Sequence, residues 1–359
     1  MQPLIIFNFM SLTRLYFKHP EPDSSRQRLY PVFLPFSGCP FKCIYCSQEA
    51  QTGQQPTPHE VQVQRIHQDI CTLFKKKPEP FCLGFFGGTF TALPAATQKL
   101  FLKTALELRR AGAVSHIRCS TRPDCIDQGR IRLLRDYGVD MVELGIQSFD
   151  SRVLSLSKRG YGGEEALDAS MRIKQNSLEL GIQLMPGLPG SDSASFARDL
   201  QATAEMQPAV VRLYPCLVLE DTLLARQWSR GEYRPWPLNT TLALVSNALL
   251  RMWLAGIPVI RTGLAPEGSL LPRIKAGPWH PALGAICRGR ALGAYVTAMA
   301  SKLGTGPVQV LVPQRYISDF WGHGKENEKL YQRSKIFRKN VDTWDHELFM
   351  LAGCAPQLP

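Results

Sequence analysis

Residues 37–49 read SGCPFKCIYCSQE and place Cys39, Cys43 and Cys46 in a C-x3-C-x2-C run. Three closely spaced thiolates can hold three corners of a cubic iron–sulfur cluster, which normally has four thiolate ligands. No fourth cysteine is close by, so one iron would lack a protein ligand and could bind another molecule. C-x2-C is also a zinc or redox spacing, but no second C-x2-C and no paired histidines follow. The run therefore favours an iron–sulfur site over a zinc site.

The composition is that of an ordinary soluble protein, with 44% hydrophobic and 20% charged residues in 359. This length suits one large domain, or one with an appendage. No apolar stretch is long enough to span a bilayer, so no membrane association is predicted. The apolar start MQPLIIFNFM lacks the basic region and cleavage site of a secretory signal. Ten cysteines without such a signal predict a reducing, cytoplasmic location and no disulfide framework.

The charge balance is basic, with 42 Lys and Arg against 30 Asp and Glu. A basic surface favours polyanions such as RNA, although it can also serve solubility alone. Six basic residues gather near the end of the chain: Lys325, Lys329, Arg333, Lys335, Arg338 and Lys339. A solvated helix face is the default interpretation of such a run, and an RNA-contacting helix is the alternative.

Strand-like and helical segments alternate from about residue 30. The strand candidates are RLYPVFLPF, FCLGFF, HIRCST, MVELGI, LGIQLMP and VVRLYPCLVL, with IPVIRTGL later in the chain. Apolar spacings of three and four predict helices over residues 59–75, 95–111, 130–137, 163–175, 192–206 and 239–255. Such alternation predicts an α/β fold of parallel βαβ units, closed into a partial (β/α)6 TIM-like barrel.

The barrel is predicted to occupy only part of the chain. Beyond about residue 265 the alternation weakens, and a small C-terminal α/β extension is expected. The predicted boundaries are an N-terminal extension over 1–27, the barrel over 28–265 and the C-terminal extension over 266–359.

Polar and glycine motifs follow successive strands. Gly87-Gly88-Thr89 follows the second strand, Thr121-Arg122-Pro123-Asp124 the third, Gln147-Ser148 the fourth and Met185-Pro186-Gly187 the fifth. In barrels of this type the chemistry sits at the carboxyl ends of the strands. These motifs therefore predict one site, shared with the cysteine run after the first strand.

Each motif has a binding role and a structural alternative. The paired glycines let backbone amides approach an amino-acid ligand. Arg122 offers a forked cation to a carboxylate, or forms an ion pair with Asp124 or Glu143. Ser120 could hydrogen-bond a ribose or the amino-acid end of a ligand. Gln147 carries a donor and an acceptor, whereas Ser148 or Asp150 would naturally cap the next helix.

Several segments together carry a family resemblance: FFGGTFTALP, STRPDCID, VELGIQSFD, MPGLPG, VRLYPCLVLEDT and GPWHPALG. They occur in order over about residues 30–290, and the chain resembles the radical SAM proteins related to the catalytic subunit of Elongator. Its cysteine spacing is the common radical SAM one, and the chain is too short for an acetyltransferase domain. It therefore looks more like the short bacterial relatives. Two departures concern the substrate: Cys125 stands where a tyrosine is frequent, and CRGRAL replaces an acidic segment after GPWHP.

The resemblance implies a radical SAM barrel, a [4Fe–4S] cluster on the three cysteines, and S-adenosylmethionine bound to the open iron. The residues implied or considered for this cofactor are Tyr45 and Met185 near adenine, Gly87, Gly88 and Thr89 at the methionine amino group, and Ser120, Arg122 and Gln147. The sequence assigns no catalytic residue.

The expected reaction is reductive cleavage of S-adenosylmethionine to methionine and a 5′-deoxyadenosyl radical. Flavodoxin or ferredoxin is the expected type of reductant. A tRNA base is the expected substrate, with RNA held by a basic surface. The alternatives are a small molecule such as a porphyrin precursor, a non-catalytic iron–sulfur redox protein, and a zinc-binding RNA module.

Overall fold

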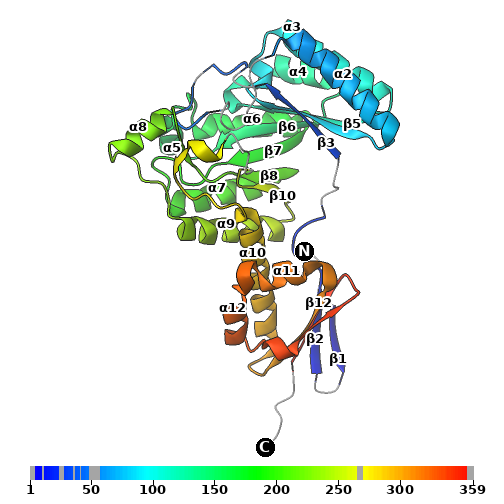
Figure 1. Cartoon of the computed structure of the whole chain (residues 1–359), viewed down its shortest axis with the longest axis vertical. Helices are drawn as coiled ribbons and strands as arrows, with labels where there is room; N and C mark the ends of the chain where they lie inside the picture. The colour runs from blue at the N-terminus through cyan, green and yellow to red at the C-terminus, as the bar shows by residue number, and fades with distance from the viewer. Residues whose placement is uncertain are drawn as a thin grey trace, which may run out of the picture. The chain divides into compact units, whose positions relative to one another are not determined.

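A computed structural model describes residues 5–9, 12–23, 28–34, 37–40, 42–47, 57–264 and 270–353, with only the backbone for 5–9, 12 and 13 (Figure 1). The chain divides into two units. Unit 1 comprises residues 1–23, 239–259 and 280–359, and unit 2 comprises residues 24–238 and 260–279. Residues 239–259 fall in unit 1 and residues 270–279 in unit 2, and the domain boundaries at residues 27/28 and 265/266 stay a prediction.

Unit 2 is built on a seven-stranded sheet with the order β10-β8-β7-β6-β5-β4-β3. Its strands are β3 (Arg28–Leu34), β4 (Phe81–Gly87), β5 (Val114–Thr121), β6 (Met141–Gln147), β7 (Glu179–Leu184), β8 (Val210–Leu213) and β10 (Val259–Thr262). Neighbouring strands from β3 to β8 pair in parallel. The sheet curls into a half-barrel, which confirms the predicted α/β fold.

Helices connect these strands, as parallel pairing requires. They are α2 (His59–Lys76), α3 (Ala95–Arg110), α4 (Gln128–Asp136), α5 (Ser151–Leu156), α6 (Gly163–Gln175), α7 (Ser193–Met206) and α8 (Leu223–Ser229). The predicted helix over 163–175 is confirmed to the residue. Asp127, Asp150 and Asp192 cap α4, α5 and α7 by accepting hydrogen bonds from backbone N–H groups of the first turn.

Burial explains why the strands read as apolar runs. Every residue from Phe81 to Phe86 in β4 is buried, as expected for a parallel strand covered on both faces. A short pair of strands, β9 (Val218–Leu219) and β11 (Ile274–Ala276), completes the strands of unit 2 that the structure describes.

Unit 1 joins the two ends of the chain in a second sheet. Its order is β1-β2-β14-β12-β13, with β1 (Ile5–Phe9), β2 (Leu12–Phe17), β12 (Val308–Pro313), β13 (Val341–Trp344) and β14 (Phe349–Gly353). β2 runs antiparallel to β14, with Leu15 opposite Leu351. Figure 1 shows the blue N-terminal strands within the same sheet as the red C-terminal strands.

Unit 1 includes α9 (Leu238–Leu254) from Asn239 onward. Three further helices, α10 (Leu283–Ala300), α11 (Ile317–Trp321) and α12 (Glu328–Arg333), pack on one face of this sheet around an aromatic and aliphatic core. The core includes Phe17, Val296, Val310, Phe320, Tyr331, Phe349 and Leu351. Within the described ranges, no helix combines the length and apolar character needed to cross a membrane.

Candidate active site

The cysteine segment packs closely against the turn after β4, and the paired glycines make this approach possible. A Cβ atom on Gly88 would lie 2.0 Å from the carbonyl oxygen of Ser37, which no real side chain tolerates. Gly87 has a φ of +99°, a conformation that favours glycine. The Thr89 N–H donates a hydrogen bond to the Ser37 carbonyl over 2.9 Å. The glycine turn therefore holds the cysteine segment in place.

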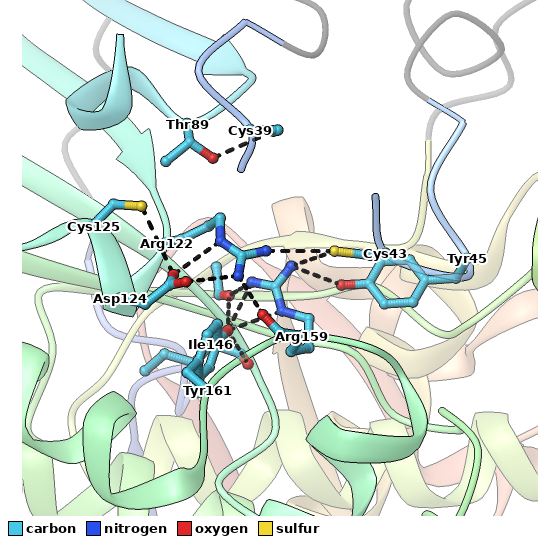
Figure 2. A network of polar contacts seen from close by, with 11 residues as sticks. Cys39, Cys43, Tyr45, Thr89, Arg122, Asp124, Cys125, Ile146, Arg159 and Tyr161 are labelled. Atoms are coloured by element: carbon cyan, nitrogen blue, oxygen red, sulfur yellow. Dashed lines mark hydrogen bonds and ion pairs between the residues drawn. The ribbon is translucent and has the colours of Figure 1, made fainter. Parts of the chain in front are cut away.

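Thr89 links this turn to the first cysteine. Its side chain is 1% exposed, and its Oγ1 lies 3.3 Å from the Sγ of Cys39. Figure 2 shows this contact on one side of the site and Cys43 on the other. Two residues predicted separately from the sequence, Cys39 and Thr89, are thus neighbours.

Arg122 follows β5 and reaches the second cysteine. Its Nε and Nη2 donate to the two carboxylate oxygens of Asp124 over 2.9 and 2.8 Å, a forked ion pair. Its Nη1 lies 3.7 Å from the Sγ of Cys43, within reach of a weak hydrogen bond to sulfur. Arg122 is 4% exposed. Its charge is therefore largely matched by Asp124, one of the two acidic partners considered from the sequence.

Arg159 is a second buried cation at this place, and the sequence motifs did not include it. Its Nη1 donates to the Sγ of Cys43 over 3.0 Å and to the Oη of Tyr45 over 3.2 Å (Figure 2). Its other nitrogens bond the Oη of Tyr161 and the carbonyl of Gly145. Arg159 is 5% exposed and has no carboxylate partner among the residues that the structure describes. A buried cation without a counter-charge is costly, so this arrangement points to an anionic ligand.

The local chain path explains how Arg159 reaches the site. Helix α5 ends at Leu156, and Lys158 adopts a left-handed φ of +52° that reverses the chain. The N–H of Arg159 then donates to the carbonyl of Leu154 over 3.0 Å. An arginine between two helices carries no periodic signal, so only the three-dimensional path identifies it.

An apolar wall borders the cysteines. Cys43, Ile44 and Tyr45 pack in one buried cluster with Leu188, Val218, Leu224 and others, and Met185 and Cys46 lie against it partly buried. Burial raises the pKa of Tyr45 well above its usual value, so its hydroxyl stays neutral beside Arg159. A backbone hydrogen bond holds Met185 against the end of β6, because the Met185 N–H donates to the Gln147 carbonyl over 2.9 Å.

Gln147 ends β6 in an unusual conformation. Its φ is +72°, which is uncommon for a residue other than glycine, and the β6–β7 register shifts between Leu144 and Gln147. Its side chain is 5% exposed and accepts a hydrogen bond from Gln183. Ser120 is half-buried at the end of β5, opposite Glu143 in the neighbouring strand. The left-handed backbone conformation of Gln147 is strained, and strained residues are common at functional sites.

The segment after Gln147 is structural, as the alternative interpretation held. Asp150 caps α5 through the N–H groups of Arg152 and Val153. Ser148 donates to the buried carboxylate of Asp199, which also accepts from the Phe149 N–H. Burial raises the pKa of Asp199 to about 6 despite these hydrogen bonds.

A buried ion triad occupies the sheet of unit 2. Glu143 of β6 forms two ion pairs: the Nε of Arg118 in β5 lies 2.9 Å from one carboxylate oxygen and the Nε of Arg212 in β8 lies 2.6 Å from the other. Both guanidinium groups also lie over the ring of Phe86. A Cβ on Gly181 would lie 2.7 Å from Glu143, so this glycine makes room for the triad.

The thiols do not converge on one point in this conformation. Cys39 is directed to Thr89 and Cys43 to the two arginines (Figure 2). In the part of the chain that the structure describes, no three Cys, His, Asp or Glu side chains are grouped as metal ligands. The donor set itself suits an anionic iron–sulfur cluster, because three thiols and two buried guanidinium groups share this part of unit 2.

Two family models match the chain. One, described as the radical SAM superfamily, matches residues 33–202, and another, described as the radical SAM C-terminal domain, matches residues 208–291.

Curated relatives extend these matches. The tRNA uridine(34) acetyltransferase of Methanocaldococcus infernus is 32% identical over 276 residues, which cover 64% of this chain and 51% of the relative. Elongator complex protein 3 of Mus musculus is 26% identical over 250 residues, covering 58% of this chain and 45% of the relative. The chain spans about half the length of the curated relatives it matches first.

A solved structure supports the fold. The archaeal Methanocaldococcus infernus Elp3, with a deletion at its N-terminus, superposes with a TM-score of 0.53 at 26% sequence identity. The match covers 67% of this chain and 59% of that chain. The resemblance to the Elongator catalytic subunit is thus confirmed by sequence and by fold.

Proposed function

Because the chain belongs to the radical SAM superfamily, we propose that it cleaves S-adenosylmethionine reductively at a [4Fe–4S] cluster held by Cys39, Cys43 and Cys46. When bound, the cluster and its cofactor supply one-electron cleavage of a carbon–sulfur bond, giving methionine and a 5′-deoxyadenosyl radical. The electron comes from a reductant such as flavodoxin or ferredoxin. A reducing cytoplasm, which also keeps thiols free, is the proposed location.

The main observation behind this proposal is the buried positive charge of Arg159 beside Cys43. Arg122 already shares its charge with Asp124, whereas Arg159 is buried against Cys43 without a carboxylate of its own. S-adenosylmethionine brings a carboxylate, and cluster binding would hold Cys43 as a thiolate; either negative charge would match this cation. Arg159 is therefore proposed as a cofactor-positioning residue beside Arg122.

The remaining site residues are proposed to shape the cofactor pocket. Gly87, Gly88 and Thr89 would present backbone groups to the methionine amino group, and their turn already holds the cysteine segment. Tyr45 and Met185 supply an apolar wall suited to adenine. Ser120 and Gln147 end neighbouring strands and would hydrogen-bond the ribose or the amino-acid end.

The proposed substrate is a tRNA base. Two observations support it: relatives carry the name tRNA uridine(34) acetyltransferase, and the chain has a formal charge of +12. A basic protein binds polyanions more readily.

The cysteine proposal is tested by single alanine variants after anaerobic reconstitution. Cys43→Ala should lose bound iron, the brown absorbance near ~400 nm and S-adenosylmethionine cleavage together. Cys71→Ala, on α2, is the matched control because Cys71 lies outside the site and should retain all three. Cleavage that persists in Cys43→Ala would refute the proposed ligand.

The substrate proposal needs a separate experiment. Reconstituted protein is incubated with reductant and S-adenosylmethionine, with and without total tRNA, and the nucleosides are analysed by mass spectrometry. A new modified nucleoside that depends on all components supports the proposal. Cleavage that tRNA does not affect, with no change in any nucleoside, argues against it.

A further inference from the structure

A group of exposed cations covers one part of unit 1. The group, termed here the α12 basic surface, consists of Lys325, Lys329, Arg333, Lys335, Arg338 and Lys339. All six side chains are exposed, and none forms an ion pair with any residue in the described ranges. Their positive charges therefore repel one another without neutralisation by an adjacent partner.

Three other arginines of unit 1, Arg288, Arg290 and Arg315, contrast with this group because each has an acidic partner. Arg288 pairs with Glu21 and Asp319, Arg290 pairs with Glu326 over 2.8 Å, and Arg315 lies 3.9 Å from Glu347. Four acidic residues of this unit, Glu21, Asp319, Glu326 and Glu347, are thus engaged elsewhere. Glu328 is the one acidic residue within α12 itself, so the surface keeps a clear positive excess.

The backbone beneath the cations is firmly anchored. Tyr331 is fully buried, and its hydroxyl donates to the Phe320 carbonyl over 2.8 Å. Ile336 is 1% exposed. The side-chain amide of Asn327 donates to the carbonyls of Gly289 and Phe320. A fixed backbone lowers the ordering cost of binding a partner.

An aromatic ring lies among the cations. Phe337 is 36% exposed, although the residue before it is buried in the core. It stands between Lys335 and Arg338 in the sequence. Cations interleaved with an exposed aromatic ring match the chemistry of nucleic-acid surfaces, where cations contact phosphates and aromatic rings stack on unpaired bases.

We propose that the α12 basic surface docks RNA, with its cations on backbone phosphates and Phe337 stacked on an unpaired base. A membrane surface is the less favoured partner, because a membrane-binding helix needs a broad exposed apolar face, whereas Tyr331 of α12 is buried and Phe337 is the single large apolar side chain exposed between residues 325 and 339. The choice of tRNA as the RNA rests on the proposed function, whereas the docking surface rests on charge and exposure alone.

The test compares two triple charge reversals in the full-length protein. The surface variant is Arg333→Glu, Lys335→Glu and Arg338→Glu. The control is Lys75→Glu, Lys76→Glu and Lys103→Glu, which changes three exposed cations of unit 2 by the same total charge. Unmodified tRNA is titrated by fluorescence anisotropy between about 50 and 200 mM salt, where phosphate contacts govern affinity.

The surface variant should weaken tRNA binding at least about tenfold. The slope of the logarithm of the association constant against the logarithm of the salt concentration should become less negative by about 2. The control should stay within about twofold of the parent. Equal losses in both variants, or no loss in the surface variant, would overturn the proposal. Loss of binding to vesicles of anionic lipid without loss of tRNA binding would assign the surface to a membrane instead.

A second variant separates stacking from charge. Phe337→Ala should weaken binding of a single-stranded oligonucleotide about tenfold while leaving the salt slope unchanged. An unchanged affinity would remove the stacking part of the proposal. RNA-independent cleavage of S-adenosylmethionine is measured alongside: the surface variant should retain it. If the parent protein fails to cleave at all, the proposed function fails while the binding result still stands.

Discussion

The guanidinium group of Arg159 donates to the sulfur of Cys43 over 3.0 Å, with both groups buried. Arg159 comes from the turn after α5 and Cys43 from the segment after β3, 116 residues apart. The contact joins a permanent cation to a proposed cluster ligand. We therefore expect Arg159 to contribute to binding of S-adenosylmethionine.

Arg159→Gln should weaken binding of S-adenosylmethionine by about 10- to 100-fold, since a charge-assisted contact is removed. Arg159→Lys keeps the positive charge but lacks the planar, forked set of N–H donors, so it should reduce the affinity for S-adenosylmethionine by a smaller factor. Equilibrium dialysis on reconstituted protein with matched iron content measures both. Arg132→Lys, exposed on α4, is the control. Unchanged affinity in Arg159→Gln would show that this cation does not serve the cofactor.

Gly88→Ala should separate the cysteine segment from the glycine turn. The added Cβ would meet the Ser37 carbonyl at 2.0 Å, and overpacking of this kind costs about 2 kcal/mol or more. We expect a lower free energy of unfolding and less iron after reconstitution. Gly129→Ala is the control, since its Cβ would make only an ordinary contact on α4. Full iron content and parental stability in Gly88→Ala would contradict this account.

Glu143→Gln should destabilise unit 2 by about 3–5 kcal/mol, because it leaves Arg118 and Arg212 buried without their shared carboxylate. Denaturant unfolding of the protein without cofactors measures the change. Glu107→Gln, on the exposed side of α3, should change stability by less than about 0.5 kcal/mol. A loss below about 1 kcal/mol in Glu143→Gln would mean that the triad is not a closed ion network.

Asp199 should make stability depend on pH. Burial raises its pKa to about 6, so between about pH 4 and pH 6 the folded protein binds more protons at this carboxyl than the unfolded chain does. The contribution of Asp199 to stability is therefore present at low pH and is lost as the pH rises through 6, by about 2–3 kcal/mol. The difference in unfolding free energy between the parent and Asp199→Asn, followed from pH 4 to 7, should fall by this amount. If the free-energy difference between the two proteins stayed constant or rose with pH, the raised pKa of Asp199 would be contradicted.

Local signals in the sequence predicted the half-barrel and most of the candidate site. The strands of unit 2 are apolar because parallel strands are covered on both faces, and the polar motifs stand where those strands end. Helix α6 begins after Gly162 and ends before Asn176, residues that favour its two ends. These features depend on neighbours in the chain, so periodicity and capping residues reveal them.

Long-range features were not predicted. Strand β2 pairs with β14 at the far end of the chain, and nothing in either segment encodes that partner. Helix α10 was not among the predicted helices; it contains three glycines, and glycine is a weak helix former. Two of them are sites of close approach: a Cβ on Gly289 would lie 2.9 Å from the Cα of Gly322, and one on Gly293 would lie 2.8 Å from Asn327. Arg159 was missed for a related reason, since its place depends on the left-handed turn at Lys158.

The most direct test of the central claim is electron paramagnetic resonance of the reconstituted, dithionite-reduced protein, recorded with and without S-adenosylmethionine. If three cysteines leave one iron open, the cofactor should bind that iron and change the spectrum of the reduced cluster, with 5′-deoxyadenosine formed in the same sample. A cluster whose spectrum is indifferent to the cofactor, with no 5′-deoxyadenosine, would contradict the claim that Cys39, Cys43 and Cys46 form a radical-generating site.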